Sequence, residues 1–416
     1  MQKIFVSNIK IDKVRHLKNL KIELSDQEMK HLILTGKNGS GKTSLLNAIA
    51  VFLNSITKSN DPMEAMRYLE IDKKNLSRFN NELNPEEKVQ EIKKRIEHYE
   101  KRINNSTNGI MLEMNCSLGS IRSEFEQGNF VVAYYKADRI FRAEEPKHVE
   151  KVELKKDYSI QEAPREKFIK YLLDMKMTQA LAVSNEKKEK AERIKHWFDS
   201  FQELLRKIFE DNSVQLEFDE DTFKFRILMD EREPFDFNTL SSGYAAILDI
   251  VVDLIIRMEK QTNKIFDFSI PGIVLIDEID THLHLALQKK ILELLITIFP
   301  NVQFIVSTHS PFIINSLDNA AIYDLEKHVL VKDGLADVPY SGIVEGYFNT
   351  DVMSATLREK YDKYRFLVQK KELTDDDFDE IADLEMYLNE IPDYLALDIT
   401  TEYQRLRMEL RNREDI

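Results

Sequence analysis

The stretch HLILTGKNGSGKTSLLNAIA, residues 31–50, decides the fold. It joins an apolar, strand-like run at residues 31–35 to the pattern GxxxxGKT at residues 36–43, and a helical pattern over residues 44–53 follows. Glycines in such a turn let successive backbone N–H groups curl around phosphate oxygens, and the next helix points its positive end at them. A simple glycine turn between strand and helix does not require Lys-Thr at its end, so the pattern predicts a nucleotide site. The residues predicted to bind the nucleotide are Gly36, Lys37, Asn38, Gly39, Ser40, Gly41, Lys42 and Thr43.

Two acidic residues downstream complete the predicted chemistry. The apolar run at residues 273–276 ends in Asp277 and Glu278. With ATP bound, we expect Lys42 to reach the β- and γ-phosphates, while Thr43 and Asp277 hold Mg²⁺. Glu278 is then placed to orient or deprotonate the attacking water. An apolar run ending in Asp-Glu is common, but downstream of a phosphate loop the functional interpretation is favoured.

A histidine follows another apolar run. Residues 304–306 are apolar, and Ser307, Thr308 and His309 come directly after them. A single histidine at the end of a strand is more often structural than catalytic. The order of phosphate loop, acidic strand and histidine strand nevertheless predicts a contact between His309 and the γ-phosphate.

A serine-rich turn lies between the phosphate loop and the acids. The sequence LSSG at residues 240–243 precedes an apolar helical pattern over residues 245–258. Ser241 and the N–H groups of Ser242 and Gly243 form a second anion-binding helix start. Because one phosphate site does not need two such cradles, we expect the second to serve a nucleotide bound by another subunit.

Composition narrows the class of protein. The chain has 416 residues, a net charge of −14 and 43% apolar residues, which excludes a disordered protein and fits two or three globular domains. The single cysteine, Cys116, cannot form an internal disulfide, so we expect a cytoplasmic protein. We expect no signal peptide, because the first residues, MQKIFVSNIKIDKV, contain no long apolar run and no cleavage site of small residues. We expect no membrane span, because the most apolar stretch contains Asp249 and Asp253.

The pattern divides the chain into four predicted regions. Residues 1–145 form the first part of the predicted nucleotide-binding domain, with a charged helical insertion at residues 59–105. Residues 146–212 form a helical lobe, and residues 213–345, which begin with a β-hairpin, form the second part of the nucleotide-binding domain. Residues 346–416 form a helical tail, for which packing onto the core and docking of a partner are equally favoured.

These motifs, in this order, resemble the ABC-type ATPase head found in SMC-like, RecF-like and OLD-like proteins. The resemblance covers residues 1–57 and 213–330. It implies an α/β fold, in which a P-loop NTPase mixed sheet with an antiparallel β subdomain carries a helical lobe and a C-terminal helical tail. It also implies two heads that clamp two Mg–ATP molecules, each lying between one phosphate loop and the partner's LSxG segment. Under this resemblance Glu278 is the catalytic base, Ser241 and Gly243 act in trans, and His309 is the switch histidine.

The segments IDEIDTHLH and FIVSTHSPFII resemble bacterial ATPases of anti-phage defence, such as those of Septu, retron and PARIS systems. That likeness implies a homodimer or higher even-numbered oligomer and a separate effector, an HNH or TOPRIM nuclease. His284 stands where SMC-like heads usually have Asp, which favours the defence branch. No glutamine follows the strand-like run at residues 130–135, where the family's Q-loop belongs, so Lys136, Asp138 or Arg139 is expected to replace it.

Other functions stay open at this stage. An OLD-like chain that is itself a nuclease needs metal-binding acids at strand ends, whereas Asp351 and the acids at 375–377 lie in helical patterns, where Thr374 is a predicted N-cap. An SMC- or RecF-like DNA-repair head needs a long coiled-coil arm, and the insertion at 59–105 is too short for one. A transporter ATPase needs a coupling glutamine, which this chain lacks after the strand-like run at residues 130–135. Nucleic acid stays open as a partner because basic and acidic residues are interleaved.

Overall fold

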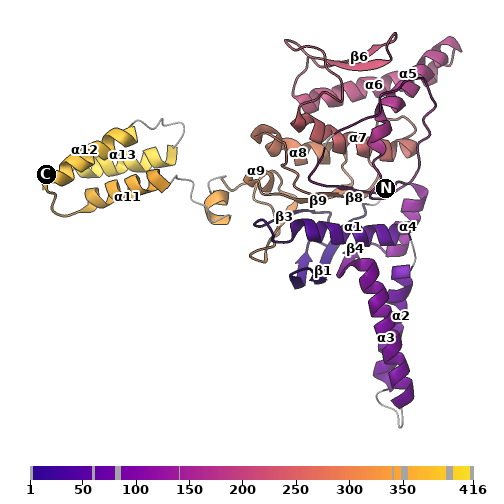
Figure 1. Ribbon diagram of the computed structural model, residues 1–416, viewed down its shortest axis with the longest axis horizontal. Helices are drawn as coiled ribbons and strands as arrows, with labels where there is room; N and C mark the ends of the chain where they lie inside the picture. The colour runs from indigo at the N-terminus through magenta and orange to yellow at the C-terminus, as the bar shows by residue number, and fades with distance from the viewer. Residues whose placement is uncertain are drawn as a thin grey trace. The chain divides into compact units, whose positions relative to one another are not determined.

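The chain folds into two compact units, residues Met1–Val338 and Pro339–Ile416, in a computed structural model (Figure 1). The first unit has the predicted α/β architecture of an ABC-type head with a helical lobe, and the second unit is the predicted helical tail. The predicted fold class is therefore confirmed. Residues 59–60 and 80–85 of the predicted insertion, and Asp351, lie outside the residues that the structure describes. The structure describes residues 3–58, 61–79, 86–139, 141–339, 342–347, 355–389 and 397–412.

A six-stranded sheet, in the order β11-β10-β3-β9-β8-β5, forms the centre of the first unit. Its strands pair in parallel except β11, which pairs antiparallel with β10 at one edge. Every residue of β3 and β8 is buried, as expected for parallel strands covered on both faces. The order places β9, the histidine strand, between the phosphate-loop strand β3 and the acidic strand β8. The strands are β3 (His31–Thr35), β5 (Val131–Tyr135), β8 (Gly272–Ile276), β9 (Val302–Ser307), β10 (Ala320–Asp324) and β11 (Val329–Val331).

Helices cover both faces of this sheet. Helix α1 (Lys42–Lys58) packs on one face, and its buried residues recur at helical spacing along one side. Figure 1 shows α7 (Ser242–Thr262) and α8 (Leu285–Ile298) on the opposite face. Two shorter helices also connect strands: α4 (Leu118–Gln127) precedes β5, and α9 (Pro311–Ile314) lies between β9 and β10. Among the helices of the described residues, none is long and apolar enough to cross a membrane.

A three-stranded antiparallel sheet, in the order β2-β1-β4, packs against α1 through a shared apolar core. It consists of β1 (Val6–Val14), β2 (Leu17–Glu23) and β4 (Ile110–Met114). The turn between β1 and β2 brings Leu17 against the phosphate loop. This sheet is the predicted antiparallel subdomain.

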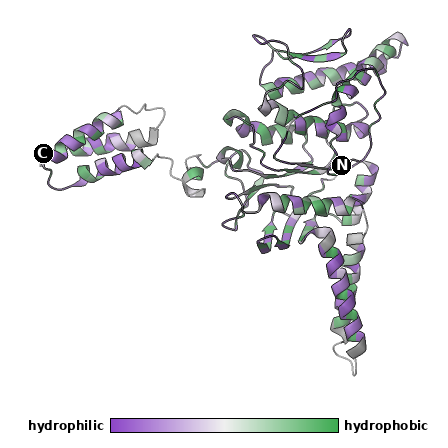
Figure 2. Ribbon diagram, in the orientation of Figure 1, coloured by the Kyte–Doolittle hydropathy of each residue, from purple (hydrophilic) through white to green (hydrophobic). Residues whose placement is uncertain are grey.

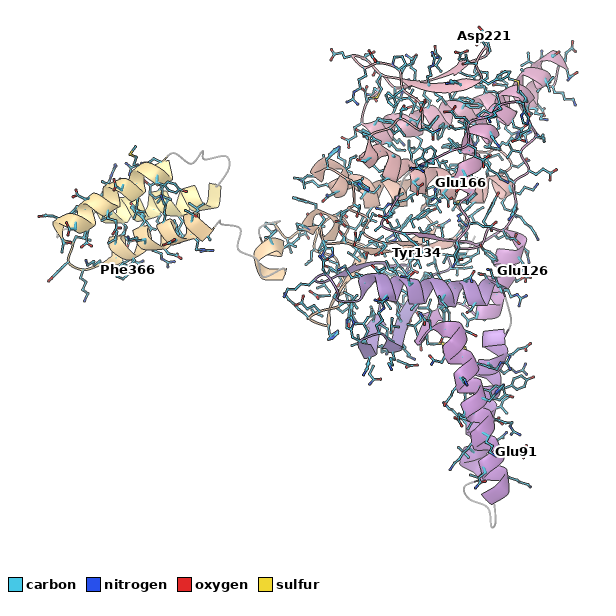
Figure 3. All side chains as sticks on the ribbon, viewed as in Figure 1. Glu91, Glu126, Tyr134, Glu166, Asp221 and Phe366 are labelled. Carbon is cyan, nitrogen blue, oxygen red and sulfur yellow. The ribbon has the colours of Figure 1, made fainter. Side chains whose placement is uncertain are left out.

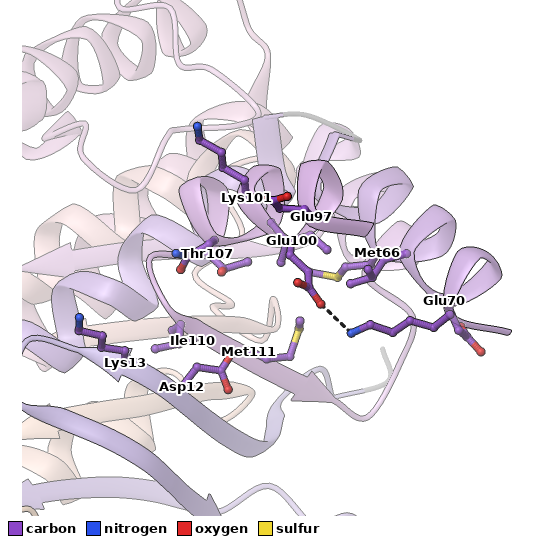
Figure 4. Close-up of a pocket in the computed structure, with 14 residues that line it drawn as sticks. Asp12, Lys13, Met66, Glu70, Glu97, Glu100, Lys101, Thr107, Ile110 and Met111 are labelled. Atoms are coloured by element: carbon purple, nitrogen blue, oxygen red, sulfur yellow. Dashed lines mark ion pairs between the residues drawn. The ribbon is translucent and has the colours of Figure 1, made fainter. Parts of the chain in front are cut away.

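The predicted helical insertion forms α2 (Asp61–Phe79) and α3 (Glu86–Thr107). The two helices are joined by Arg95, whose guanidinium donates hydrogen bonds of 2.9 and 3.0 Å to the Asp72 carboxylate. Figure 2 shows α3 as mostly hydrophilic. A cavity of about 820 Å³ lies between these helices and the antiparallel sheet (Figure 4), and the Lys73–Glu100 ion pair of 2.9 Å lies at its edge.

The helical lobe is anchored to α7 by a buried carboxylate. Glu259 accepts hydrogen bonds from the Tyr171 hydroxyl (2.9 Å) and from the indole N–H of Trp197 (3.1 Å). Burial raises the pKa of Glu259 to about 7, although these two hydrogen bonds oppose the shift. The lobe is therefore held through polar contacts as well as through its aromatic core. Its elements are the 3₁₀ turn η1 (Pro164–Lys167), α5 (Phe168–Ser184) and α6 (Lys188–Phe209). The predicted β-hairpin follows α6 as β6 (Gln215–Asp219) and β7 (Lys224–Leu228).

The second unit is a helical bundle with its own core. Tyr364 of α11, Leu384 of α12 and Leu406 of α13 are among the buried residues that join its three helices. Figure 2 shows hydrophilic and hydrophobic residues alternating along all three, as expected of amphipathic helices. The described elements of this unit are α11 (Ala355–Gln369), α12 (Asp375–Asn389), α13 (Leu397–Arg411) and a π-helical turn η2 (Ile343–Tyr347).

Thr374 caps α12, as predicted. Its hydroxyl accepts a hydrogen bond of 3.3 Å from the Asp377 N–H, and the Asp377 carboxylate accepts one of 2.8 Å from the Thr374 N–H. Lys370 and the Thr374 N–H lower the pKa of Asp377 to about 2. The acidic cluster thus has a capping role at the positive end of a helix.

We expect Thr374→Ala to destabilise the start of α12 by about 1 kcal/mol, because the Asp377 N–H loses the hydroxyl oxygen that caps it. Hydrogen exchange of the first-turn amides, measured in the full chain, should then accelerate by about fivefold. Thr374→Ser keeps the hydroxyl and should exchange like the wild type. Unchanged exchange in the alanine variant would show that the cap does not stabilise the helix.

Candidate nucleotide-binding site

The phosphate loop joins β3 to α1, and its glycines adopt backbone conformations that other residues rarely reach. The φ angles of Gly36, Gly39 and Gly41 are +128°, +83° and +102°. A Cβ atom at Gly36 would lie 2.9 Å from the Ser40 hydroxyl oxygen, and one at Gly41 would lie 3.0 Å from Leu17 Cδ1. The sequence GxxxxGKT therefore produces the curled loop that the pattern predicts.

Lys42 is the cation at the centre of this loop. Its ammonium group donates hydrogen bonds to the carbonyl oxygens of Gly36 (2.8 Å) and Lys37 (3.2 Å), and the residue is 6% exposed. Burial lowers the pKa of Lys42, while the nearby carboxylates of Glu278 and Asp277 favour its charged form. The side chain is thus folded over the loop and faces the acidic residues from the other strand.

The outer side of the loop is open. A cavity of about 470 Å³ lies beside it, between the β1–β2 turn and the residues after β10. At its edge Lys37 forms an ion pair of 2.8 Å with Glu326, and a ring nitrogen of His16 lies 3.1 Å from the Ser40 carbonyl oxygen. Asn38 and Thr43 are exposed. A ligand therefore has access to the loop from this side.

The two predicted acids lie directly after β8, where Ser307 fixes both. Asp277 is 3% exposed, and its carboxylate accepts a hydrogen bond of 2.6 Å from the Ser307 hydroxyl. The same hydroxyl accepts a hydrogen bond of 2.8 Å from the Glu278 N–H. Glu278 has a φ of +46°, a left-handed conformation that is uncommon for a residue with a side chain. Sequence reasoning missed the role of Ser307, which it noted only as a residue between the apolar run and His309.

His309 follows β9, and the strand order places it between the phosphate loop and the acids. Its Nε2 atom is buried and has no hydrogen-bond partner within the described part of the chain. Burial and the positive charge of Lys42 lower the pKa of His309, so the imidazole is neutral near pH 7. Asp280, which the sequence did not single out, lies near His309 as well. Its carboxylate accepts a hydrogen bond of 2.5 Å from the Thr308 hydroxyl.

The segment Ser241–Gly243 lies at the start of α7, which begins at Ser242 and not at Ala245 as the sequence indicated. Ser241 and Ser242 are exposed, whereas Gly243 is buried. A Cβ atom at Gly243 would lie 3.0 Å from the carbonyl oxygen of His282, in the loop after the acids. Among the described residues, no hydrogen bond or ion pair joins this segment to the phosphate loop of its own chain.

The loop after β5 holds the three residues that could replace the expected glutamine. Lys136 and Asp138 are exposed, and Arg139 is 4% exposed. Tyr134, labelled at the level of the central sheet in Figure 3, is a further residue that the sequence did not indicate. Its buried hydroxyl has no hydrogen-bond partner among the described residues, and burial together with the charge of Asp277 raises its pKa.

The chain is similar in sequence to known bacterial proteins. The chain is 34% identical to the Retron Ec83 probable ATPase of Escherichia coli over 132 residues, which is 32% of this chain and 24% of that protein. It is 24% identical to the Septu protein PtuA of Bacillus mycoides over 328 residues, which is 75% of this chain and 39% of that protein. The chain thus spans between about a quarter and two fifths of the length of these relatives.

Solved structures also match. The SMC head domain from Thermotoga maritima is 14% identical, with a TM-score of 0.35 over 77% of this chain and 94% of that chain. A structure of the recombination mediator protein RecF is 15% identical, with a TM-score of 0.34 over 80% of this chain and 99% of that chain. A family model matches residues 32–315, a range that contains the phosphate loop, the segment Ser241–Gly243, both acids and His309. The chain therefore belongs to the family described as "AAA domain, putative AbiEii toxin, Type IV TA system".

Proposed function

We propose that this chain is an ATPase and the switching subunit of a bacterial, cytoplasmic anti-phage defence system. Two copies close face to face on two Mg–ATP molecules, hydrolyse them slowly, and so control a separate effector, an HNH or TOPRIM nuclease. The observation that carries the proposal is the pair of exposed serines at the start of α7, which have no hydrogen bond or ion pair to the phosphate loop of their own chain among the described residues. An anion-binding helix start of this kind, in a chain that already has a phosphate loop, is suited to a second subunit's nucleotide.

The residues around the loop fit Mg–ATP. The donors offered to a metal ion are the Thr43 hydroxyl and the Asp277 carboxylate, and hard oxygen ligands of this kind suit Mg²⁺. Bound Mg²⁺ would neutralise charge on the phosphates. Lys42 is the proposed ligand of the β- and γ-phosphates, and the backbone N–H groups of the loop bind the remaining phosphate oxygens. The proposed loop ligands are Gly36, Lys37, Asn38, Gly39, Ser40 and Gly41.

Glu278 is the proposed general base, and His309 the proposed contact of the γ-phosphate. The backbone of Glu278 is fixed by Ser307, while its carboxylate accepts a hydrogen bond of 3.3 Å from Thr281. The neutral imidazole of His309 has one ring nitrogen without a partner, so it can donate a hydrogen bond to a phosphate oxygen or accept one from water. Both groups thus have the chemistry that an in-line attack on a γ-phosphate needs.

The second site is completed in trans by Ser241, Ser242 and Gly243. The first N–H groups of α7 have no partner within the helix, as in every α-helix, and its positive end favours a phosphate. Gly243 brings this helix start against the loop that follows Glu278. Closure of a partner onto this segment would therefore act directly on the position of the turn that carries Glu278.

Similarity to the Septu protein PtuA and to retron ATPases supports a role in defence. The chain spans less than half of either relative. The separate effector, and a signal that triggers the switch, are therefore proposed. The bundle formed by α11, α12 and α13 is the proposed docking region for the effector, and nucleic acid stays open as a partner.

The test is nucleotide-dependent dimerisation. We expect the wild-type chain to sediment as a dimer with Mg²⁺ and a non-hydrolysable ATP analogue, and as a smaller species without it. Ser241→Arg places a bulky cation at the proposed interface and should weaken this dimerisation at least about tenfold, since a misplaced charge at an interface costs more than about 1.4 kcal/mol.

The matched control is Ser123→Arg, which makes the same change at an exposed serine of α4 and should dimerise like the wild type. Analogue binding should persist in both variants. A Ser241→Arg chain that dimerises normally, or a wild-type chain that stays monomeric with bound nucleotide, would contradict the face-to-face arrangement.

A further inference from the structure

We propose that Arg139 is a positioning residue that holds the turn carrying Glu278 in its working conformation. The inference rests on the proposed role of Glu278 as the general base. Arg139 belongs to the loop after β5, where a glutamine was expected, and it acts on the backbone of the acidic turn.

The guanidinium group of Arg139 binds three successive carbonyl oxygens. It donates hydrogen bonds to the backbone oxygens of Asp277 (2.6 Å), Glu278 (2.9 Å) and Ile279 (3.4 Å). A fourth bond, of 3.1 Å, reaches the Lys136 carbonyl oxygen in the arginine's own loop. The planar fork of an arginine can satisfy several carbonyls at once, which a lysine cannot do.

The turn needs such support because Glu278 is strained. A residue with a side chain keeps a left-handed φ of +46° only where its surroundings enforce it. The N–H of Glu278 is held by Ser307 and its carbonyl oxygen by Arg139. Both peptide groups that flank its Cα are thus fixed, so the direction in which the carboxylate leaves the backbone is fixed as well.

The same stretch of chain also holds the loop before Ser241. Asn238 forms a reciprocal pair with Ala143, whose N–H donates to the side-chain oxygen (3.0 Å) and whose carbonyl accepts from the side-chain amide (3.1 Å). The carboxylate of Asp249, in α7, favours the charged form of Arg139 against the effect of burial. The loop after β5 therefore contacts the catalytic turn through Arg139, and the loop that leads to the proposed trans site through Ala143.

Arg139 reaches the reaction through the backbone of Glu278. Its fork is used on carbonyl oxygens, so the expected loss on substitution is in turnover and not in ATP binding. A misplacement of a catalytic group by a fraction of an ångström is enough to slow the chemical step.

The experiment compares Arg139→Lys with Arg257→Lys. Arg257 is 3% exposed and also donates to backbone carbonyls, those of Val132 (3.1 Å) and Ser159 (3.1 Å), but among the described residues it has no hydrogen bond or ion pair to the acidic turn. Both substitutions keep a buried positive charge and lose the fork. We expect Arg139→Lys to lower kcat about tenfold with KM for ATP within about threefold, whereas Arg257→Lys lowers Tm and leaves kcat within about twofold.

A second comparison shows whether Arg139 acts through Glu278. In a Glu278→Gln background, under single-turnover conditions, Arg139→Lys should cost less than about twofold, because the base that it positions is already lost. Equal losses in both backgrounds, or a KM that rises as much as kcat falls, would overturn the inference and leave the proposed function intact. A Glu278→Gln chain that hydrolyses ATP like the wild type would overturn the proposed function, and the inference with it.

Discussion

Lys42→Ala is expected to reduce the affinity for Mg–ATP about 100-fold. The ammonium group of Lys42 lies inside the loop, within hydrogen-bond distance of the Gly36 and Lys37 carbonyl oxygens. With ATP bound it can exchange these for two charge-assisted bonds to phosphate oxygens, at about 1.5 kcal/mol each. Their loss gives about 3 kcal/mol, which corresponds to about 100-fold in the dissociation constant. Titration calorimetry with a non-hydrolysable analogue measures this directly.

The control for this variant is Lys58→Ala, at the exposed end of the same helix α1. It removes one positive charge from the same element and should bind the analogue within about twofold of the wild type, because exposed charges so far apart are screened. A Lys42→Ala chain that binds the analogue within threefold of the wild type would show that this lysine does not hold the phosphates. The increase of Tm on addition of Mg–ATP gives a second readout, since a bound ligand stabilises the folded state by mass action.

The fold could be predicted from the sequence wherever local pattern decides it. The apolar run before Gly36 and the helical pattern after Thr43 fix a strand, a loop and a helix, because these signals depend on neighbours in the chain. The order of the strands could not be predicted in this way. That β9 lies between β3 and β8 depends on its pairing with β3, about 270 residues away in sequence, and with β8, about 30 residues away, on which periodicity gives no information. The placement of His309 beside the phosphate loop follows from that order.

The candidate site shows the same limit at the level of single residues. Motif spacing indicated Asp277 and Glu278, and their roles remain predictions. The sequence carried no signal for Ser307, and it offered Arg139 only as one of three residues that could replace a glutamine, because each acts on backbone atoms that only the folded chain brings within reach. The left-handed φ of Glu278 could not be expected either, since glycine and asparagine are the residues that usually adopt it.

The acids of α7 show how tertiary context changes the meaning of a residue. In the sequence, Asp249 and Asp253 are interruptions that argue against a membrane span. In the structure, Asp253 accepts hydrogen bonds from the Tyr135 hydroxyl (2.8 Å) and from Arg257 (2.7 Å), and Arg165 pairs with Asp249. Each buried charge thus has an opposite charge beside it, which makes its burial tolerable. Spacing by four residues placed these groups on one side of the helix, but their partners come from distant segments.

Glu278→Gln is expected to lower the rate of ATP hydrolysis about 1,000-fold, within the range by which a general base contributes, while the affinity for ATP stays within about threefold. Glutamine keeps the size of the side chain and an oxygen that can accept from Thr281, but it cannot take a proton from water. Under the proposed mechanism the variant should therefore accumulate as an ATP-bound dimer, which size exclusion with multi-angle light scattering and analysis of the bound nucleotide would detect.

Asp280→Asn is the matched comparison for Glu278→Gln, because the Asp280 carboxylate lies near the same acids and already accepts a hydrogen bond from Thr308. An asparagine oxygen can keep this bond, so we expect a loss of less than about tenfold. Should Asp280→Asn prove the more damaging change, or should Glu278→Gln neither trap ATP nor stabilise a dimer, the base would have to be assigned elsewhere and the two-subunit mechanism given up.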